Sequence, residues 1–81
     1  MIVITVYVLE GAKKRYVGIT ANLERRLAEH RSVSHSGKLI GEFKVLHTET
    51  FPDYSSARKR ERYLKSGKGR EWLLEKYPKR P

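Results

Sequence analysis

Cysteine is absent from this chain of 81 residues, which excludes disulfides and thiolate-bound zinc as braces for the fold. Internal repeats and linker-like stretches are also missing, so we predict one domain that spans residues 1–81. A domain of this length buries only a small core and keeps little stability in reserve.

Long apolar runs are lacking as well. The most apolar stretch, residues 1–9, is interrupted by Thr5 and Tyr7 and has no basic leader. Such a stretch is too short to span a bilayer and does not resemble a signal peptide. We therefore expect a cytoplasmic protein with no membrane partner.

Acidic residues are scarce. Nine acidic residues stand against eighteen lysines and arginines, which leaves a net charge of +9. This excess is typical of nucleic-acid binders, although a basic surface that serves only solubility is the alternative. The excess concentrates between residues 58 and 70, in a segment without the broad apolar face of a membrane-surface helix. We assign nucleic-acid binding to six residues of this basic cluster: Arg58, Lys59, Arg62, Lys65, Lys68 and Arg70.

The hydrophobic pattern predicts six elements. Strands are expected at residues 2–9, 15–20 and 42–51, with Phe43, Val45 and His47 on one side of the third strand. Three helices are expected. The first covers about residues 22–31, the second runs from a cap at Ser55 to residues 66–67, and the third covers about residues 69–77. Residues 32–41 are expected to form a loop. The order β-β-α-β-α-α predicts an α+β fold, a small three-stranded antiparallel sheet flanked by about three helices.

Two tyrosines and a glycine share one face of the predicted hairpin. Period-2 alternation places Tyr7 opposite the Val6 and Val8 face of its strand, and places Tyr16 and Gly18 on a common face of the next strand. Tyrosine is ordinary strand composition. Glycine weakens a strand interior and often marks the close approach of a ligand. We therefore add Gly18 to the candidate nucleic-acid-binding residues.

The first predicted helix carries two polar residues beside its apolar stripe. Leu23 and Leu27 define the apolar direction, and Arg26 and His30 lie close to it. A buried arginine is costly unless it meets a counter-charge or a ligand. The pair therefore indicates a phosphate site. The alternative is that Arg26 extends to the helix edge while His30 is an ordinary core histidine.

The second predicted helix carries a carboxylate on its apolar stripe. Tyr54, Ala57, Glu61 and Leu64 follow helical spacing. A carboxylate on such a stripe needs an arginine or a metal ion as its partner. A structural salt bridge from Glu61 to Arg26 and a metal site both remain open.

In this order and spacing, the residues resemble the GIY-YIG nucleases, in particular the small stand-alone members related to the excinuclease nuclease domain. Segment 5–7, Thr-Val-Tyr, stands at the first family motif, and segment 16–18, Tyr-Val-Gly, matches the second. Arg26 and His30 follow at the family's spacing. Segment 60–65 resembles the part that holds the metal-binding glutamate.

The resemblance implies metal-dependent hydrolysis of DNA phosphodiester bonds. Glu61 would hold a single divalent cation, Mg²⁺ or Mn²⁺, together with water and the scissile phosphate. Tyr7 would act as general base toward the attacking water, and His30 would take or relay its proton. Tyr16 would orient water or phosphate, and Arg26 would bind the phosphate.

Three departures from the family pattern matter. Thr5 and Val6 replace the glycine and isoleucine of the first motif, and the family's asparagine near the C-terminus has no counterpart. No separate DNA-binding domain is expected, so binding to double-stranded, branched or single-stranded DNA would rest on the basic cluster and loop 32–41. Such binding should be salt-sensitive and weakly sequence-selective.

Three functions therefore stay open. The first is a structure-selective or weakly sequence-selective endonuclease. The second is a basic nucleic-acid-binding module without turnover. The third is an interaction domain in which Trp72 and Tyr77 form a dimer contact, although these residues could equally pack the last helix onto the core. We expect a monomer or a weak homodimer.

Overall fold

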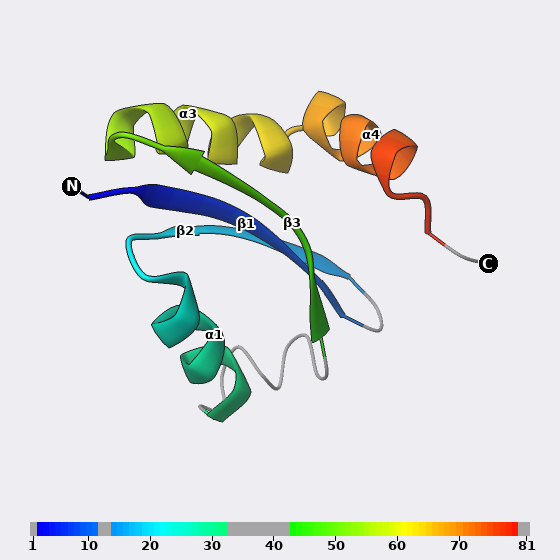
Figure 1. The fold of residues 1–81 in the computed structure, drawn as a ribbon. Helices are drawn as coiled ribbons and strands as arrows, with labels where there is room; N and C mark the ends of the chain where they lie inside the picture. Colours follow the sequence, from blue (N-terminus) through cyan, green and yellow to red (C-terminus); the bar gives the residue numbers. More distant parts are fainter. Residues whose placement is uncertain (1, 12–13, 33–42, 80–81) are drawn as a thin grey trace.

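The computed structural model describes residues 2–11, 14–32 and 43–79. The strands are β1 (Ile4–Gly11), β2 (Arg15–Thr20) and β3 (Phe43–Phe51), and the helices are α1 (Leu23–Ser32), α3 (Tyr54–Lys65) and α4 (Gly67–Lys76). The three strands form one antiparallel sheet in the order β2-β1-β3 (Figure 1). The predicted α+β class and element order are confirmed.

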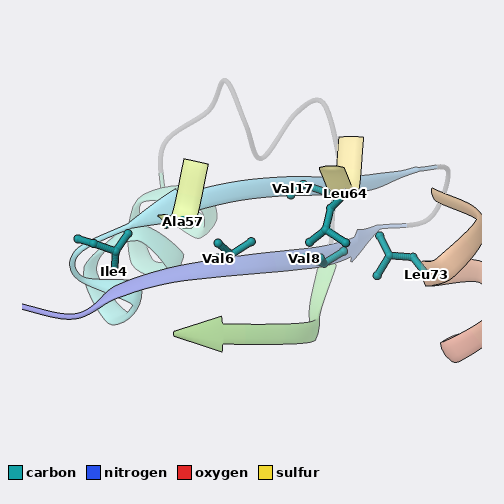
Figure 2. Packing of buried hydrophobic residues seen from close by; sticks show 7 residues of the cluster. All are labelled: Ile4, Val6, Val8, Val17, Ala57, Leu64 and Leu73. Atoms are coloured by element: carbon teal, nitrogen blue, oxygen red, sulfur yellow. The ribbon is translucent and has the colours of Figure 1, made fainter. Parts of the chain in front are cut away.

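Helices cover both faces of the sheet. Helices α3 and α4 lie on one face, and α1 lies on the other (Figure 1). The larger core fills the α3/α4 face, as Figure 2 shows, and consists of Ile4, Val6, Val8, Val17, Ala57, Leu64 and Leu73. A smaller cluster fills the α1 face, where Tyr7 and Leu9 pack against Leu23, Leu27 and Phe43. The expected alternation of Val6 and Val8 against Tyr7 is therefore confirmed.

The first strand is shifted relative to its predicted bounds. β1 runs from Ile4 to Gly11 rather than over residues 2–9, because its pairing with β2 continues to Glu10 and Arg15. An ion pair of 2.9 Å joins the Arg15 Nη2 and Glu10 Oε2 atoms. The guanidinium of Arg15 also donates to the carbonyl oxygens of Leu73 and Tyr77. Arg15 thus ties the hairpin to the end of α4.

A β-bulge in β3 changes which side chains share a face. Val8 pairs with His47, whereas Leu9 pairs with Val45, so Leu46 is an extra residue between them. The side chain of Phe43 therefore packs in the α1 cluster, while His47 contacts Trp72 of α4. The prediction that Phe43, Val45 and His47 lie on one side is wrong, because the inserted residue reverses the alternation.

Two predicted helix boundaries are corrected. The cap of α3 is Asp53 rather than Ser55, since the Asp53 Oδ1 atom accepts from the Ser56 N–H at 2.7 Å. Gly67 does not follow a finished helix but begins α4, which starts two residues earlier than predicted. α1 begins at Leu23, and the Oδ1 atom of Asn22 caps it by accepting from the Arg25 N–H at 3.0 Å.

Ser66 joins α3 to α4 by capping both helices. Its N–H donates to the Arg62 carbonyl at 3.1 Å, and its Oγ accepts from the Gly69 N–H at 3.2 Å. The helices meet so closely that a Cβ atom on Gly69 would lie 1.9 Å from the Tyr63 carbonyl oxygen. Only glycine fits there without a backbone shift.

The predicted loop 32–41 falls almost wholly outside the described residues. Ser32 is the last residue of α1, and the rest of the loop, with its proposed role in DNA binding, lies beyond the described ranges. None of the helices in the described ranges has the length and apolar character needed to cross a membrane.

A polar network fastens β3 to the two C-terminal helices. The Nε2 atom of His47 lies 2.7 Å from Glu49 Oε2, and its Nδ1 atom lies 2.8 Å from the Tyr77 hydroxyl. Arg60 donates to both Glu49 oxygens, at 3.0 Å and 3.1 Å from its Nε atom. The Arg60 guanidinium also lies 4.8 Å from the ring centre of Trp72. Because these contacts hold the guanidinium of Arg60, this arginine of α3 is not free to bind DNA.

We expect Glu49→Gln to lower the free energy of unfolding at pH 7 by about 1–3 kcal/mol. Burial opposes ionisation of Glu49, but hydrogen bonds from Arg60 and His47 and their charges outweigh it and hold its pKa below the usual value. The ionised carboxylate therefore stabilises the fold above its unfolded pKa, and this contribution is lost as the pH falls through the lower folded pKa. Urea unfolding between pH 3 and pH 7 measures the effect.

The matched control is Glu75→Gln, which removes the same charge from an exposed position on α4. The control should change stability little at any pH. A Glu49→Gln deficit of equal size at pH 3 and pH 7 would contradict the role of the ionised carboxylate.

Candidate active site

Two tyrosines and a histidine meet on the α1 face of the sheet. The Tyr7 hydroxyl from β1 lies 3.2 Å from the Nε2 atom of His30 on α1. The ring centroid of Tyr16 from β2 lies 6.1 Å from that of Tyr7 and 5.2 Å from that of His30. Tyr7 and His30 are only 1% and 3% exposed, whereas Tyr16 is 38% exposed. Tyr16 is therefore the most exposed member of this trio.

Gly18 makes this arrangement possible. It pairs directly with Tyr7 across the hairpin. A Cβ atom at position 18 would lie 2.6 Å from the Tyr7 hydroxyl and 3.0 Å from the Tyr16 Cε1 atom. The phenol ring of Tyr7 therefore extends across the buried backbone of β2, the edge strand of the sheet. The close approach inferred at Gly18 exists, but Tyr7 makes it rather than a ligand.

The hydroxyl of Tyr7 is strongly held in its neutral form. Burial raises the pKa of Tyr7 well above its ordinary value, and the neighbouring Tyr16 raises it further. The charge of Arg26 acts in the opposite direction, and the charge of Glu61 adds to the rise. Both charged side chains named as site residues therefore act on the Tyr7 hydroxyl.

His30 is a buried, neutral base. Burial and the charge of Arg26 lower its pKa, and Glu29 offsets only part of this. In the tautomer that carries its proton on Nδ1, the Nε2 atom accepts a hydrogen bond from the Tyr7 hydroxyl. The buried Nδ1 atom has no hydrogen-bond partner within the part of the chain that the structure describes. His30 is therefore not the fully satisfied core histidine of the alternative interpretation.

Arg26 lies at the edge of the site, not on the buried stripe of α1. Its side chain is 46% exposed, and its Nη1 atom lies 3.7 Å from Glu29 Oε1. The guanidinium extends to the helix edge, as the alternative interpretation of Arg26 holds, because Leu23 and Leu27 are only half-buried and leave that edge open. Its charge nevertheless acts on both Tyr7 and His30. An anion at this edge would meet an accessible guanidinium.

Glu61 approaches the site from α3, on the opposite face of the sheet. Its side chain is 15% exposed, and its Oε2 atom lies 3.1 Å from the Nζ atom of Lys65, one helical turn further on. A structural salt bridge to Arg26 is therefore not found among the described residues, since Glu61 pairs with Lys65 and Arg26 pairs with Glu29. The charge of Glu61 nevertheless contributes to the raised pKa of Tyr7.

The basic cluster divides between two surfaces. All six of its residues, Arg58, Lys59, Arg62, Lys65, Lys68 and Arg70, are exposed. On the wheel of α3, Arg58 and Lys65 share a flank with Glu61, whereas Lys59 and Arg62 point away from the buried Ala57 and Leu64. The sequence alone suggests one basic cluster. In the structure, the residues that share a flank with Glu61 lie near the candidate site, and the others lie away from it.

Comparison with known proteins agrees with this geometry. The model of the GIY-YIG catalytic domain matches residues 3–77. The chain belongs to the GIY-YIG family. A UPF0213 protein of Natronomonas pharaonis is 42% identical to this GIY-YIG domain over 64 residues, or 75% of each chain. The solution NMR structure of a UPF0213 protein from Bacillus halodurans is similar with a TM-score of 0.58 and 28% identity, covering 93% of this chain and 85% of that one.

We expect Gly18→Ala to destabilise the GIY-YIG domain by about 1–3 kcal/mol, as overpacking of a buried position does. The added methyl group would displace the Tyr7 ring, which is itself fixed by His30 and by the α1 cluster. Urea unfolding measures the loss. Gly67→Ala is the matched control, because a Cβ there meets nothing within 4 Å. Equal stability of the two variants would contradict the packing of Tyr7 over β2.

A pH titration of the histidine ring signals by NMR should give His30 a pKa below its reference value of 6.5. Burial and the Arg26 charge disfavour the imidazolium form, so Arg26→Gln should move that pKa upward. A His30 pKa at or above the reference value in the unmodified protein would contradict its assignment as a neutral base.

Proposed function

We propose that this GIY-YIG domain is a divalent-metal-dependent DNA endonuclease that hydrolyses phosphodiester bonds with weak sequence selectivity. The observation that supports it best is the buried hydrogen bond between Tyr7 and a neutral His30, beneath a half-exposed Tyr16. A phenol and an imidazole in direct contact form a proton-transfer pair, and the exposed Arg26 nearby supplies a cation for phosphate.

The pair can activate a water molecule without a charged intermediate on the tyrosine. The raised pKa of Tyr7 opposes its ionisation, so its proton needs an acceptor. His30 Nε2 is such an acceptor at 3.2 Å. As the Tyr7 proton moves to His30, the phenol oxygen takes a proton from the water that attacks phosphorus. The general base and the proton relay that the family resemblance implies would thus be the adjacent side chains of Tyr7 and His30.

Tyr16 and Arg26 are placed to hold the phosphate group. Tyr16 is the exposed ring of the trio, and its hydroxyl would orient the phosphate or the attacking water. The guanidinium of Arg26 presents a fork of donors that matches phosphate oxygens. Stabilising the charge that develops on those oxygens would contribute to catalysis.

The residues present fit a single Mg²⁺ or Mn²⁺ ion. No group of three histidine, aspartate or glutamate side chains gathers as a metal cage within the described residues. Glu61 alone is nonetheless a suitable ligand, because Mg²⁺ keeps several waters and accepts phosphate oxygens. A bound ion would supply Lewis-acid stabilisation of the leaving oxygen. Glu61 would have to exchange its ion pair with Lys65, so we expect weak metal binding without DNA.

A nucleic-acid-binding module without turnover is the second candidate. The ion pair between Glu61 and Lys65 favours it, since a carboxylate neutralised by a lysine is a poorer metal ligand. The dimer interpretation of the C-terminal helix has less support, because Trp72 and Tyr77 pack against the core. Both remaining candidates use the basic cluster, and only the endonuclease requires Tyr7.

We expect Tyr7→Phe to reduce cleavage of flap, nicked or single-stranded DNA by about 10²–10⁴-fold, the usual range for loss of an acid–base group. The phenylalanine keeps the ring over Gly18 and removes only the hydroxyl that contacts His30. Glu61→Ala should also abolish most cleavage. Cleavage is measured on labelled DNA in Mg²⁺ or Mn²⁺, with EDTA as the metal-free control.

Glu75→Ala is the control variant, because it removes a carboxylate from an exposed position on α4 and should leave cleavage unchanged. If Tyr7→Phe and Glu61→Ala cut as well as the unmodified protein, a contaminating nuclease is responsible and the mechanism is wrong. If the unmodified protein binds DNA in a salt-dependent manner but cuts no substrate with either metal, the module without turnover is correct.

A further inference from the structure

A cavity of about 500 Å³ opens beside β2, between the hairpin and the two C-terminal helices. Its deepest walls are apolar, since Leu64 and Leu73 line it and are 0% and 3% exposed. Val17 extends this buried surface, and Leu74, which is 44% exposed, lines the cavity nearer to solvent. A cavity of this size falls within the range of about 300–1,000 Å³ that small-molecule groups occupy in proteins.

Among the residues that the structure describes, every charged one that lines the cavity is a cation. The guanidinium of Arg15 is engaged in an ion pair with Glu10 and in hydrogen bonds to backbone carbonyls, so it is not available to a ligand. The other four, Lys14, Lys65, Arg70 and Lys79, surround the apolar surface. An apolar floor with a cationic border suits a ligand that has a flat apolar part and a phosphate backbone. Nucleotides combine both features.

The cavity borders the candidate active site at Tyr16 on β2. Tyr16 belongs to the catalytic trio and also lines the cavity. Lys65, another lining residue, forms the ion pair with Glu61. A strand whose phosphate lies near Tyr16 and Arg26 would therefore bring its next nucleotide to the mouth of the cavity.

We propose that this cavity receives an unpaired nucleotide of the DNA strand, next to the phosphate held in the active site. The inference rests on the proposed endonuclease and names its substrate class: DNA with a single-stranded branch or tail. A base inside a duplex is stacked on its neighbours, so it cannot reach an apolar floor without being extruded. An unpaired base avoids most of that cost, and Lys14, Arg70 and Lys79 line the same cavity as cations for the neighbouring phosphates.

The experiment measures binding in EDTA, so that no cleavage is required. Fluorescence anisotropy compares a blunt DNA hairpin, the same hairpin with an unpaired tail, and the hairpin with an abasic tail. We expect the unpaired tail to strengthen binding about tenfold, in line with the contribution of one well-placed base. The abasic tail should lose most of this gain, because it retains the phosphates and lacks the base.

Three variants test the cavity itself. Leu74→Ser removes part of the apolar wall without changing the charge, and Arg70→Ala removes a lining cation. Both should reduce the preference for the tail by at least about threefold, a part of the stacking and phosphate contribution of one nucleotide. Lys68→Ala is the matched control, because it removes an exposed cation of the same helix that does not line the cavity. It should weaken binding to the blunt and tailed hairpins by the same factor.

The proposal is overturned if the tail gives no gain, if the abasic tail binds as tightly as the normal one, or if Leu74→Ser and Arg70→Ala keep the full preference. These outcomes are independent of cleavage. A tail preference in a protein that cuts no DNA would refute the endonuclease and retain the cavity. Cleavage that depends on Tyr7 without any tail preference would refute the cavity alone.

Discussion

The phenol ring of Tyr7 occupies the space that a side chain at position 18 would fill, and the candidate active site depends on this contact. The ring extends across Gly18 of β2, which is an edge strand of the sheet. His30 reaches that hydroxyl from the α1 face, and Glu61 acts on it from the α3 face. A side chain at position 18 would exclude the ring and separate these groups.

The two faces of the sheet hold different kinds of side chain. The α3/α4 face contains the larger aliphatic core, and the polar network of His47, Glu49 and Arg60 fastens β3 to that core. Stability is concentrated there. The α1 face has a smaller apolar cluster and can accommodate a buried phenol, a neutral imidazole and an accessible guanidinium. The division leaves the site on the face with the smaller apolar cluster, apart from the main core.

Sequence patterns predicted most of the fold, because apolar residues that recur with the period of a strand or a helix mark the buried face of that element. These predictions failed where an extra residue entered a strand and where a different residue capped a helix. The extra residue Leu46 reversed the face of His47, and Asp53 rather than Ser55 capped α3 by accepting the Ser56 N–H. Neither has a distinct hydrophobic pattern. The cavity beside β2 was not anticipated either, since its lining residues are far apart in the chain and most of them stand in no motif.

The sequence by itself determined the class of fold, the family and the candidate residues for phosphate chemistry, because spacing and alternation are local properties of a chain. Only the tertiary structure decided the partners. It placed Tyr7 against His30, paired Glu61 with Lys65, and left Arg26 exposed beside Glu29. Partners of charged and polar side chains depend on distances between separate elements, and these distances follow from strand order and helix packing rather than from sequence spacing.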